Sequence, residues 1–528
     1  MVSTFPKLVL RRIFYYLTPQ ELLTCTLVCK NFLRAFRVDP ILKHRIDLLA
    51  SGFIDAWPGE RTGDDIFQSH RRLQEGWWNL TWSGKMKITL LPGCFDIRTS
   101  GGILCQLITT PHNTNVLSFT HLPTRNHYDC ASSWRSPELR GNLFDVLMDA
   151  GQDLLIMMEI KADAGLLQTC SVRLHLFSLS AIKTHPEFRT NVGYLEHEFR
   201  SPKMPTIKTR VFGSHVGALH TLGDDNELVL WNWRKGTKIS VLRMPRSQLQ
   251  SFVFVSEKLI VITSVHPGTG VASLQLLSFT EGGRLGMRES RPRLLAEFQL
   301  PILARPFAFT HVTFTTDCAP SSQMTPTTLA NHNDWTHDAR TSVPAFEHQL
   351  LHLTITVKKP GFRTAPAAMR RMSLFVHARH LVQFSDTSLR HAIISWDRWS
   401  EGTRMVTTFP NNQWTAQRAT PKRVGHLHGQ RYMTLLENGS LFMLDFNTVG
   451  FRRGKDKTLL SATAHAHPQH MPRTIAAGAL FKEEVTTALP YRQIATYEAF
   501  KYSDLMIDDE RIIAFSRAKP NEIDIFIV

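Results

Sequence analysis

The side chains that could carry out chemistry form few patterns in this chain. Histidines alternate at His426 and His428 and again at His465 and His467, with His470 close behind. Alternate residues of a β-strand lie on one face, so each pair could supply two ligands to a zinc ion. The chain has 24 histidines, and no carboxylate or thiolate lies close to either pair in the sequence, so chance clustering is the better interpretation. We predict neither a metal site nor a cofactor.

Two other patterns approach catalytic motifs without completing them. Residues 450–455, Gly-Phe-Arg-Arg-Gly-Lys, resemble a phosphate-binding loop, but one residue is missing between the glycines and Asp456 replaces the required hydroxyl. The acidic runs 224–225 and 508–510 are flanked by strand patterns, where acidic residues commonly form turns. Serine hydrolase, zinc protease, EF-hand and dinucleotide-binding signatures do not occur. We therefore predict a protein that is not an enzyme.

The composition is that of a folded protein with a basic surface. Of 528 residues, 43% are hydrophobic and 20% are charged, which is enough apolar material for a large core. The net charge of +16 would favour acidic partners such as nucleic acid, but the lysines and arginines are dispersed, so nucleic acid is not the expected partner. Seven cysteines without a CxxC pair are typical of reduced thiols. Because neither a membrane-spanning run nor a signal peptide is found, we expect a cytoplasmic or nuclear protein without membrane contact.

The densest local signals lie in residues 5–35, where the pattern predicts two short helices joined by a tight turn. Residues 18–21, Thr-Pro-Gln-Glu, have the order of a helix start. The threonine hydroxyl can accept from a free N–H group, proline needs no donor at the first position, and the glutamate completes a capping box. Before this turn, apolar residues recur at steps of three and four from residue 9 to residue 17.

The second of these helices carries apolar residues on more than one face. Leu22, Leu23, Leu27 and Leu33 wind around it instead of forming a single stripe. A helix pair cannot bury two apolar faces against itself. Either a partner protein or the rest of the chain must cover the second face, and periodicity alone does not separate these alternatives.

The same residues resemble an F-box, a motif that begins with Leu-Pro and ends in a Leu-Val-Cys-(Lys/Arg) helix with an aromatic residue two positions later. This chain has Phe5-Pro6, an aliphatic run, Thr18-Pro19, and then residues 27–30, Leu-Val-Cys-Lys, followed by Phe32. It departs from the family pattern at Phe5, where leucine is usual, and at Leu8, where an acidic residue is common.

The resemblance implies docking on the Skp adaptor of SCF-type cullin–RING ubiquitin ligases, with the cullin and RING subunits joined through the adaptor. The overall plan is similar to the F-box families of basidiomycete fungi. The adaptor-binding residues that the resemblance implies are Phe5, Pro6, Val9, Leu10, Ile13, Leu17, Pro19, Leu22, Leu27, Val28, Cys29 and Phe32.

A third helix and a connector follow this segment. Asp39-Pro40 is a helix start, and Gly52 suits the left-handed position that ends one. We therefore assign residues 1–52 to an F-box helical domain. Residues 53–84 form a linker with one amphipathic helix at 65–77, whose end carries a cluster of tryptophans that we expect to pack on the next domain.

From residue 85 to residue 528 the pattern is that of an all-β domain. Short apolar, β-branched runs alternate with Gly, Asn, Asp and Pro turns, and similar hairpins recur at 218–233, 431–446 and 504–528. This repetition is typical of a β-propeller, here a degenerate one of six to eight blades that resembles the WD-repeat family. Leu230-Trp231-Asn232-Trp233 lies near the position of that family's Trp-Asp. A pair of β-sandwiches remains an alternative.

Taken together, these patterns predict an α+β multidomain chain that acts as the substrate-recognition subunit of an SCF-type ligase. The F-box would bind the adaptor, and the propeller would capture a protein whose identity the sequence does not specify. The alternative is a stand-alone scaffold whose basic propeller binds nucleic acid or another acidic partner.

Overall fold

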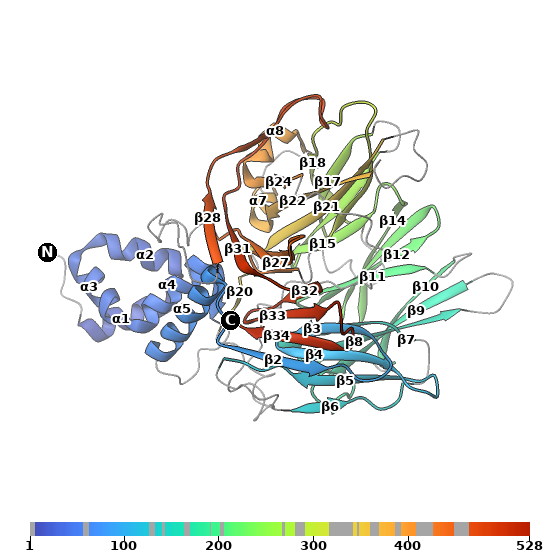
Figure 1. The fold of residues 1–528 in the computed structure, drawn as a ribbon, viewed down its shortest axis with the longest axis horizontal. Helices are drawn as coiled ribbons and strands as arrows, with labels where there is room; N and C mark the ends of the chain where they lie inside the picture. The colour runs from blue at the N-terminus through green and yellow to red at the C-terminus, as the bar shows by residue number, and fades with distance from the viewer. Residues whose placement is uncertain are drawn as a thin grey trace.

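The computed structural model describes residues 6–528 apart from 56–62, 126–131, 140–142, 163–168, 191, 201–204, 267–269, 280–290, 316–341, 346–347, 360–368, 386–391, 408–425 and 448–463. Helices at the N-terminus form a lobe beside a large all-β domain (Figure 1). Among the residues described, no helix has the length and apolar character that crossing a membrane requires.

The lobe contains four short helices, which we call the helical unit: α1 (Lys7–Tyr16), α2 (Pro19–Val28), α3 (Lys30–Val38) and α4 (Pro40–Ser51). The capping box is present, since Thr18 Oγ1 accepts from the N–H of Glu21 at 3.3 Å and Glu21 Oε2 accepts from the N–H of Thr18 at 2.7 Å. The hydrogen bonds from Thr18 also lower the pKa of Glu21.

The prediction of only two helices before residue 36 is wrong. At Cys29 the backbone is extended, with φ −157° and ψ 162°, so the expected second helix is split into α2 and α3. The break lets α3 fold back and bring the ring of Phe32 edge-on to Phe14, with centroids 5.6 Å apart. This contact is made between α1 and α3, so helical periodicity carries no sign of it.

The helix predicted after Asp39 is confirmed as α4. Asp39 accepts from the N–H of Ile41 at 3.0 Å, and Gly52 ends the helix with φ +76°, a conformation that favours glycine. Next to α4 lies α5 (Gly63–Asn79), which matches the connector helix expected at 65–77.

The β-domain is a seven-bladed propeller, which confirms the predicted architecture and excludes the sandwich pair. Blade 1 has β3 (Cys94–Ser100), β4 (Ile103–Thr109), β5 (Asn115–His121) and β6 (Ser133–Arg135); blade 2 has β7 (Leu143–Asp149), β8 (Leu154–Ala162), β9 (Thr169–Ser178) and β10 (Tyr194–Arg200). Blade 3 has β11 (Thr206–Phe212), β12 (His215–Leu222), β13 (Asp225–Asn232) and β14 (Thr237–Pro245); blade 4 has β15 (Ser251–Ser256), β16 (Leu259–Val265), β17 (Ala272–Ser278), β18 (Arg293–Gln299) and β23 (Ala392–Ile394).

The remaining blades include strands from distant parts of the sequence. Blade 5 has β19 (Ala308–Phe314), β21 (Leu350–Lys358), β22 (Met369–His377) and β24 (Thr403–Val406); blade 6 has β25 (Leu427–His428), β26 (Arg431–Leu435), β27 (Ser440–Asp445), β28 (Ala464–Gln469) and β31 (Tyr491–Ala499). Blade 7 has β32 (Tyr502–Ile507), β33 (Arg511–Ser516), β34 (Glu522–Ile527) and β2 (Gly84–Thr89). Smaller elements are β1 (Phe53–Asp55) paired with β20 (Ser342–Pro344), β29 (Arg473–Ile475) paired with β30 (Val485–Thr487), and the short helices α7 (Ala378–Val382) and α8 (Trp396–Trp399).

The first strand of the β-domain closes the propeller. β2 pairs antiparallel with β34 from the opposite end of the domain, with Lys85 opposite Phe526. Closure by this pairing covers an edge of β34 that would otherwise be exposed. Trp231 and Trp233 lie at and just beyond the end of β13 in blade 3, and both rings are buried, with Trp233 Nε1 donating to the carbonyl of Gly213 at 2.8 Å.

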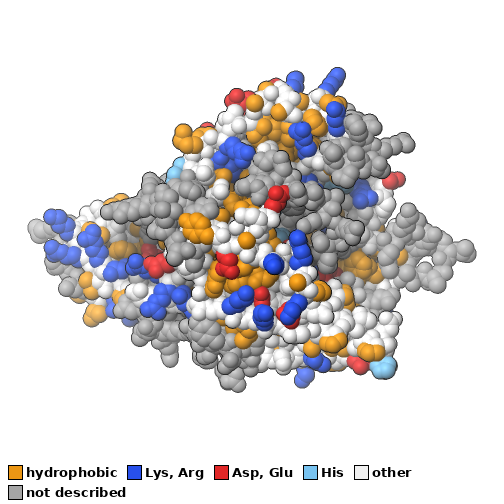
Figure 2. Space-filling model, in the orientation of Figure 1, with side chains coloured by type: hydrophobic (Ala, Val, Ile, Leu, Met, Phe, Trp, Pro, Cys, Tyr) orange, Lys and Arg blue, Asp and Glu red, His pale blue; other side chains and the backbone are white. Residues whose placement is uncertain are grey.

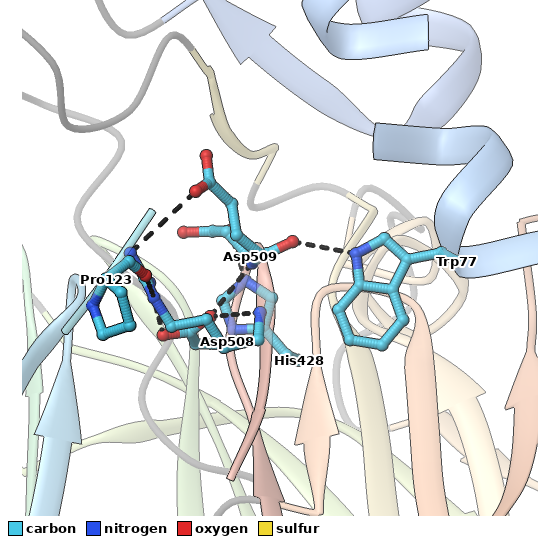
Figure 3. Close-up of polar contacts among 7 residues, drawn as sticks. Trp77, Pro123, His428, Asp508 and Asp509 are labelled. Atoms are coloured by element: carbon cyan, nitrogen blue, oxygen red, sulfur yellow. Dashed lines mark hydrogen bonds and ion pairs between the residues drawn. The ribbon is translucent and has the colours of Figure 1, made fainter. Parts of the chain in front are cut away.

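α5 joins the helical unit to blades 6 and 7. Trp77 is fully buried in the same apolar cluster as Met433 of blade 6 and Ile512 of blade 7. Its Nε1 donates to the carbonyl of Asp509 at 2.9 Å (Figure 3). The guanidinium of Arg431 lies 5.1 Å from the centre of the Trp77 ring, which confirms that the tryptophan cluster packs on the next domain.

The turn that accepts the Trp77 hydrogen bond also joins three blades. His428 Nε2 in blade 6 lies 2.5 Å from Asp509 Oδ1, and Arg511 Nε donates at 2.5 Å to the carbonyl of Pro123, which follows β5 of blade 1 (Figure 3). Arg511 also pairs with Asp508 at 2.9 Å within the turn. The orientation of α5 is therefore set where blades 6, 7 and 1 meet.

We expect Trp77→Ala to lower the free energy of unfolding by about 3–5 kcal/mol, because it removes a large buried ring and leaves a cavity. Trp77→Phe keeps much of the ring but loses the hydrogen bond to Asp509, so a loss of about 1–2 kcal/mol is expected. Urea denaturation followed by circular dichroism measures both. Arg72→Ala on the exposed face of α5 is the control and should change stability by less than about 0.5 kcal/mol. Equal effects of Trp77→Ala and Arg72→Ala would contradict the assignment.

The contact between α4 and α5 should weaken in acid. Burial lowers the pKa of His44 to about 4, and burial with the nearby His44 and Arg431 lowers that of His70 to about 3. The rings lie 5.8 Å apart. In the unfolded chain the pKa of each is about 6.5, so below that pH the unfolded state binds protons that the folded state does not. Stability is therefore full above about pH 6.5 and falls as the pH drops towards 4.

Hydrogen exchange of α4 and α5, corrected for the intrinsic rate, should be faster at pH 5 than at pH 7. His44→Leu should reduce this difference, because among the residues described neither ring nitrogen of His44 has a hydrogen-bond partner, and leucine does not titrate. Exchange that is independent of pH in the wild type would show that these histidines do not govern the contact.

Candidate protein-docking surface

Apolar side chains are exposed on the helical unit far more densely than elsewhere. Eight of the fifteen large apolar side chains exposed in the described structure lie between residues 8 and 38. We call these eight the exposed apolar set: Leu8, Val9, Ile13, Tyr16, Leu23, Leu27, Val28 and Val38. Figure 2 shows apolar side chains among lysines and arginines on this lobe, at the left of the view. Such a concentration marks a surface that a partner can cover.

The helical unit has its own small core, which decides which apolar residues face outward. Phe14, Leu22, Leu42 and Ile46 are buried together, with Phe32 partly buried against them. The core takes apolar side chains from all four helices, and the exposed apolar set lies on other faces of α1, α2 and α3. The propeller does not bury these side chains, so of the two alternatives for covering the second face, the rest of this chain is excluded as far as the structure describes it.

The residues that the sequence assigned to adaptor binding fall into distinct environments. Pro6, Val9, Ile13, Leu27 and Val28 are exposed. Leu17, Pro19, Cys29 and Phe32 are partly buried, Leu10 and Leu22 are buried, and Phe5 lies outside the described residues. Leu10 and Leu22 therefore serve the unit's own fold.

Three exposed residues on the same helices were missing from that assignment. Leu8 and Tyr16 on α1 are 78% and 81% exposed, and Leu23 on α2 is 41% exposed. Their apolar character was visible in the sequence, but the motif assigns no apolar residue to these positions, and the direction of each side chain depends on the packing of α1 against α3.

Polar contacts hold α1 in place on the unit. Arg45 of α4 donates to the carbonyls of Phe14, Tyr15 and Leu17 at 3.2, 3.1 and 2.6 Å, which satisfies acceptors that the end of α1 leaves free. Arg11 pairs with Asp39 at 2.5 Å, and Arg11 Nε also donates to Tyr15 Oη at 2.9 Å, an interaction that raises the pKa of Arg11.

We expect Arg45→Met to destabilise the helical unit by about 1–3 kcal/mol, because up to three carbonyl groups lose a charged donor. The loss should appear as faster hydrogen exchange in α1, with the propeller strands unchanged. Lys43→Met, at a partly exposed position on the same helix, is the matched control. If the amide protons of α1 are protected from exchange in Arg45→Met as they are in the wild type, water replaces the guanidinium without loss of stability.

The other patterns singled out in the sequence serve the fold or fall outside the structure. His426 Nε2 lies 3.2 Å from Asp504 Oδ1, and His428 Nε2 lies 2.5 Å from Asp509 Oδ1, so each histidine pairs with a carboxylate of blade 7. No group of three or more His, Cys, Asp or Glu that could hold a metal occurs among the residues described. The acidic runs 224–225 and 508–510 lie at hairpin turns, as interpreted, while residues 450–456 lie outside the described range.

Comparison with known families supports the assignment of the N-terminal helices. The F-box-like family model matches residues 3–49, which include α1 to α3 and most of α4. No curated protein matches the chain.

The solved structures that match this chain include the following three. The WD40 domain of SCAP from fission yeast has 9% identity and a TM-score of 0.28, covering 84% of this chain and 94% of its own. The uncharacterized protein lmo1340 from Listeria monocytogenes EGD-e has 8% identity and a TM-score of 0.29, covering 70% and 96%. The AfRom2 CNH domain has 9% identity and a TM-score of 0.29, covering 79% and 100%. Likenesses this distant assign no function. The chain therefore carries a segment, residues 3–49, that matches the F-box-like family, followed by a seven-bladed β-propeller domain.

Proposed function

We propose that this chain is the substrate-recognition subunit of an SCF-type ubiquitin ligase. In this proposal residues 1–52 dock on the Skp adaptor, and the propeller formed by residues 85–528 captures a protein substrate. Residues 53–84 link these two domains. The observation that carries the proposal is the exposure of the motif's own apolar residues, above all Leu27 at 85% and Val28 at 65%. Removing these side chains from water is the driving force for docking.

The proposed docking surface consists of the outward members of the motif together with their exposed neighbours. From the motif it includes Pro6, Val9, Ile13, Leu27 and Val28. Leu8, Tyr16 and Leu23 add to it from the same two helices. A few fully desolvated side chains carry most of the energy of such an interface.

The arrangement in Figure 1 leaves both binding functions free to act together. α1, α2 and α3 lie at the end of the lobe far from the propeller, with α4 and α5 between them. An adaptor on the outer helices would leave the propeller open to a substrate. A receptor of this kind forms no bonds itself but raises the effective concentration of substrate lysines near the conjugating enzyme, which the cullin and RING subunits recruit.

The propeller supplies the substrate-binding part of the proposal. Its blades form a rigid scaffold, and loops on such a scaffold commonly carry specificity. The proposal places the chain where ubiquitin ligases work, in the cytoplasm, the nucleus or both. Catalysis belongs to other subunits, so this chain is proposed as a non-catalytic receptor.

We expect Leu27→Asp and Val28→Asp each to weaken adaptor binding about 30-fold or more, because a carboxylate would have to enter an apolar interface. Both side chains are exposed, so the fold should be retained. Isothermal titration calorimetry with purified Skp adaptor measures the change. Val192→Asp on the propeller is the matched control, since Val192 is 61% exposed. Wild-type affinity in both helical variants would refute the proposal.

A further inference from the structure

The charged side chains around the exposed apolar set are nearly all basic. In residues 6–39 the exposed cations without an ion-pair partner in the described structure are Arg12, Lys30, Arg34 and Arg37. The only carboxylates in this stretch are engaged: Glu21 closes the capping box, and Asp39 is 4% exposed and binds Arg11 and Tyr15. The surface around the apolar set is therefore electropositive (Figure 2).

Three of these cations lie along one side of α3. Lys30, Arg34 and Arg37 are separated by four and three residues, a spacing that places them on the same face of a helix. This basic stripe begins two residues after Val28, so it directly follows the most exposed apolar pair of α2.

The stripe does not serve the stability of α3. Like charges at these spacings repel by about 0.2–0.5 kcal/mol per pair. Arg37, in the last turn, is favoured by the helix dipole, but Lys30, at the first position, is opposed by it. A helix selected only for its own stability would place an acidic residue there, which indicates that the charges serve an interaction outside the chain.

We propose that the adaptor surface that receives Leu27 and Val28 is bordered by carboxylates that face Lys30, Arg34 and Arg37, and that this attraction sets the rate of association. The inference rests on the proposed function and specifies the partner as an acidic, apolar-centred surface. Exposed ion pairs add little to affinity, but opposite fields steer two proteins together and raise the association rate constant. The steering weakens as salt screens the charges.

Stopped-flow binding of the full chain to purified Skp adaptor, between about 50 and 500 mM NaCl, tests this inference. The wild-type association rate constant should fall about tenfold across that range. The triple variant Lys30→Glu, Arg34→Glu, Arg37→Glu should associate at least about tenfold more slowly at low salt, with a dissociation rate constant within about threefold of wild type. The neutral triple variant Lys30→Gln, Arg34→Gln, Arg37→Gln should lie between them.

The matched control is a triple variant that reverses the charge of three exposed basic side chains on the propeller: Lys183→Glu, Lys258→Glu, Arg517→Glu. It changes the net charge equally but should leave the association rate constant within about threefold of wild type, because these charges lie away from the proposed interface. Circular dichroism tests whether each variant is folded. If the glutamate variant is not folded, the association rate constant of the glutamine variant is compared with that of the wild type instead.

The outcomes separate the two proposals. Adaptor binding that is abolished by Leu27→Asp but insensitive to salt and to the stripe variants would overturn the charge inference alone. Equal slowing by the stripe and propeller variants would also overturn it, because total charge would then explain the effect. A folded wild-type chain with no affinity for the adaptor would overturn the proposed function and this inference together.

Discussion

The burial of Trp77 between α5 and blades 6 and 7 is the contact on which the arrangement of this protein depends. Its ring joins the apolar cluster of the propeller, while its Nε1 is bonded to the backbone of the turn at Asp509. The chain passes from α5 almost directly into β2, which closes the propeller against β34. One indole therefore links the helical lobe to the closure of the β-domain, and neither can shift without disturbing the other.

Polar groups at the same junction limit the ways in which these parts can meet. Arg511 is buried, and although burial lowers its pKa, the carboxylates of Asp508 and Glu510 more than compensate and hold the pKa above its ordinary value. Buried charges of this kind are weak evidence for stability, because desolvation offsets much of their attraction. Their value lies in geometry, since a guanidinium bonded to Asp508 and to the carbonyl of Pro123 tolerates few alternative arrangements.

At the end of the lobe far from the propeller, apolar side chains remain uncovered. A unit of four short helices is too small to bury every apolar side chain it carries. The core takes Phe14 and Leu22, and residues such as Leu27 remain in water. The lobe is thus firmly anchored on the propeller side through α4 and α5 and open on the side of α1 to α3, an asymmetry suited to a docking module.

The sequence by itself determined the features that depend on neighbouring residues. The caps at Thr18, Asp39 and Gly52 were readable because they satisfy backbone groups within one turn, and strand alternation identified the β-domain. Only the tertiary structure decided which apolar residues face outward and why α2 ends at Cys29. It also decided the number of blades in the propeller that β2 closes. Leu22 and Leu27 look alike in the sequence, and one is buried while the other is 85% exposed because the choice depends on contacts with Phe14 and Leu42, which are distant along the chain.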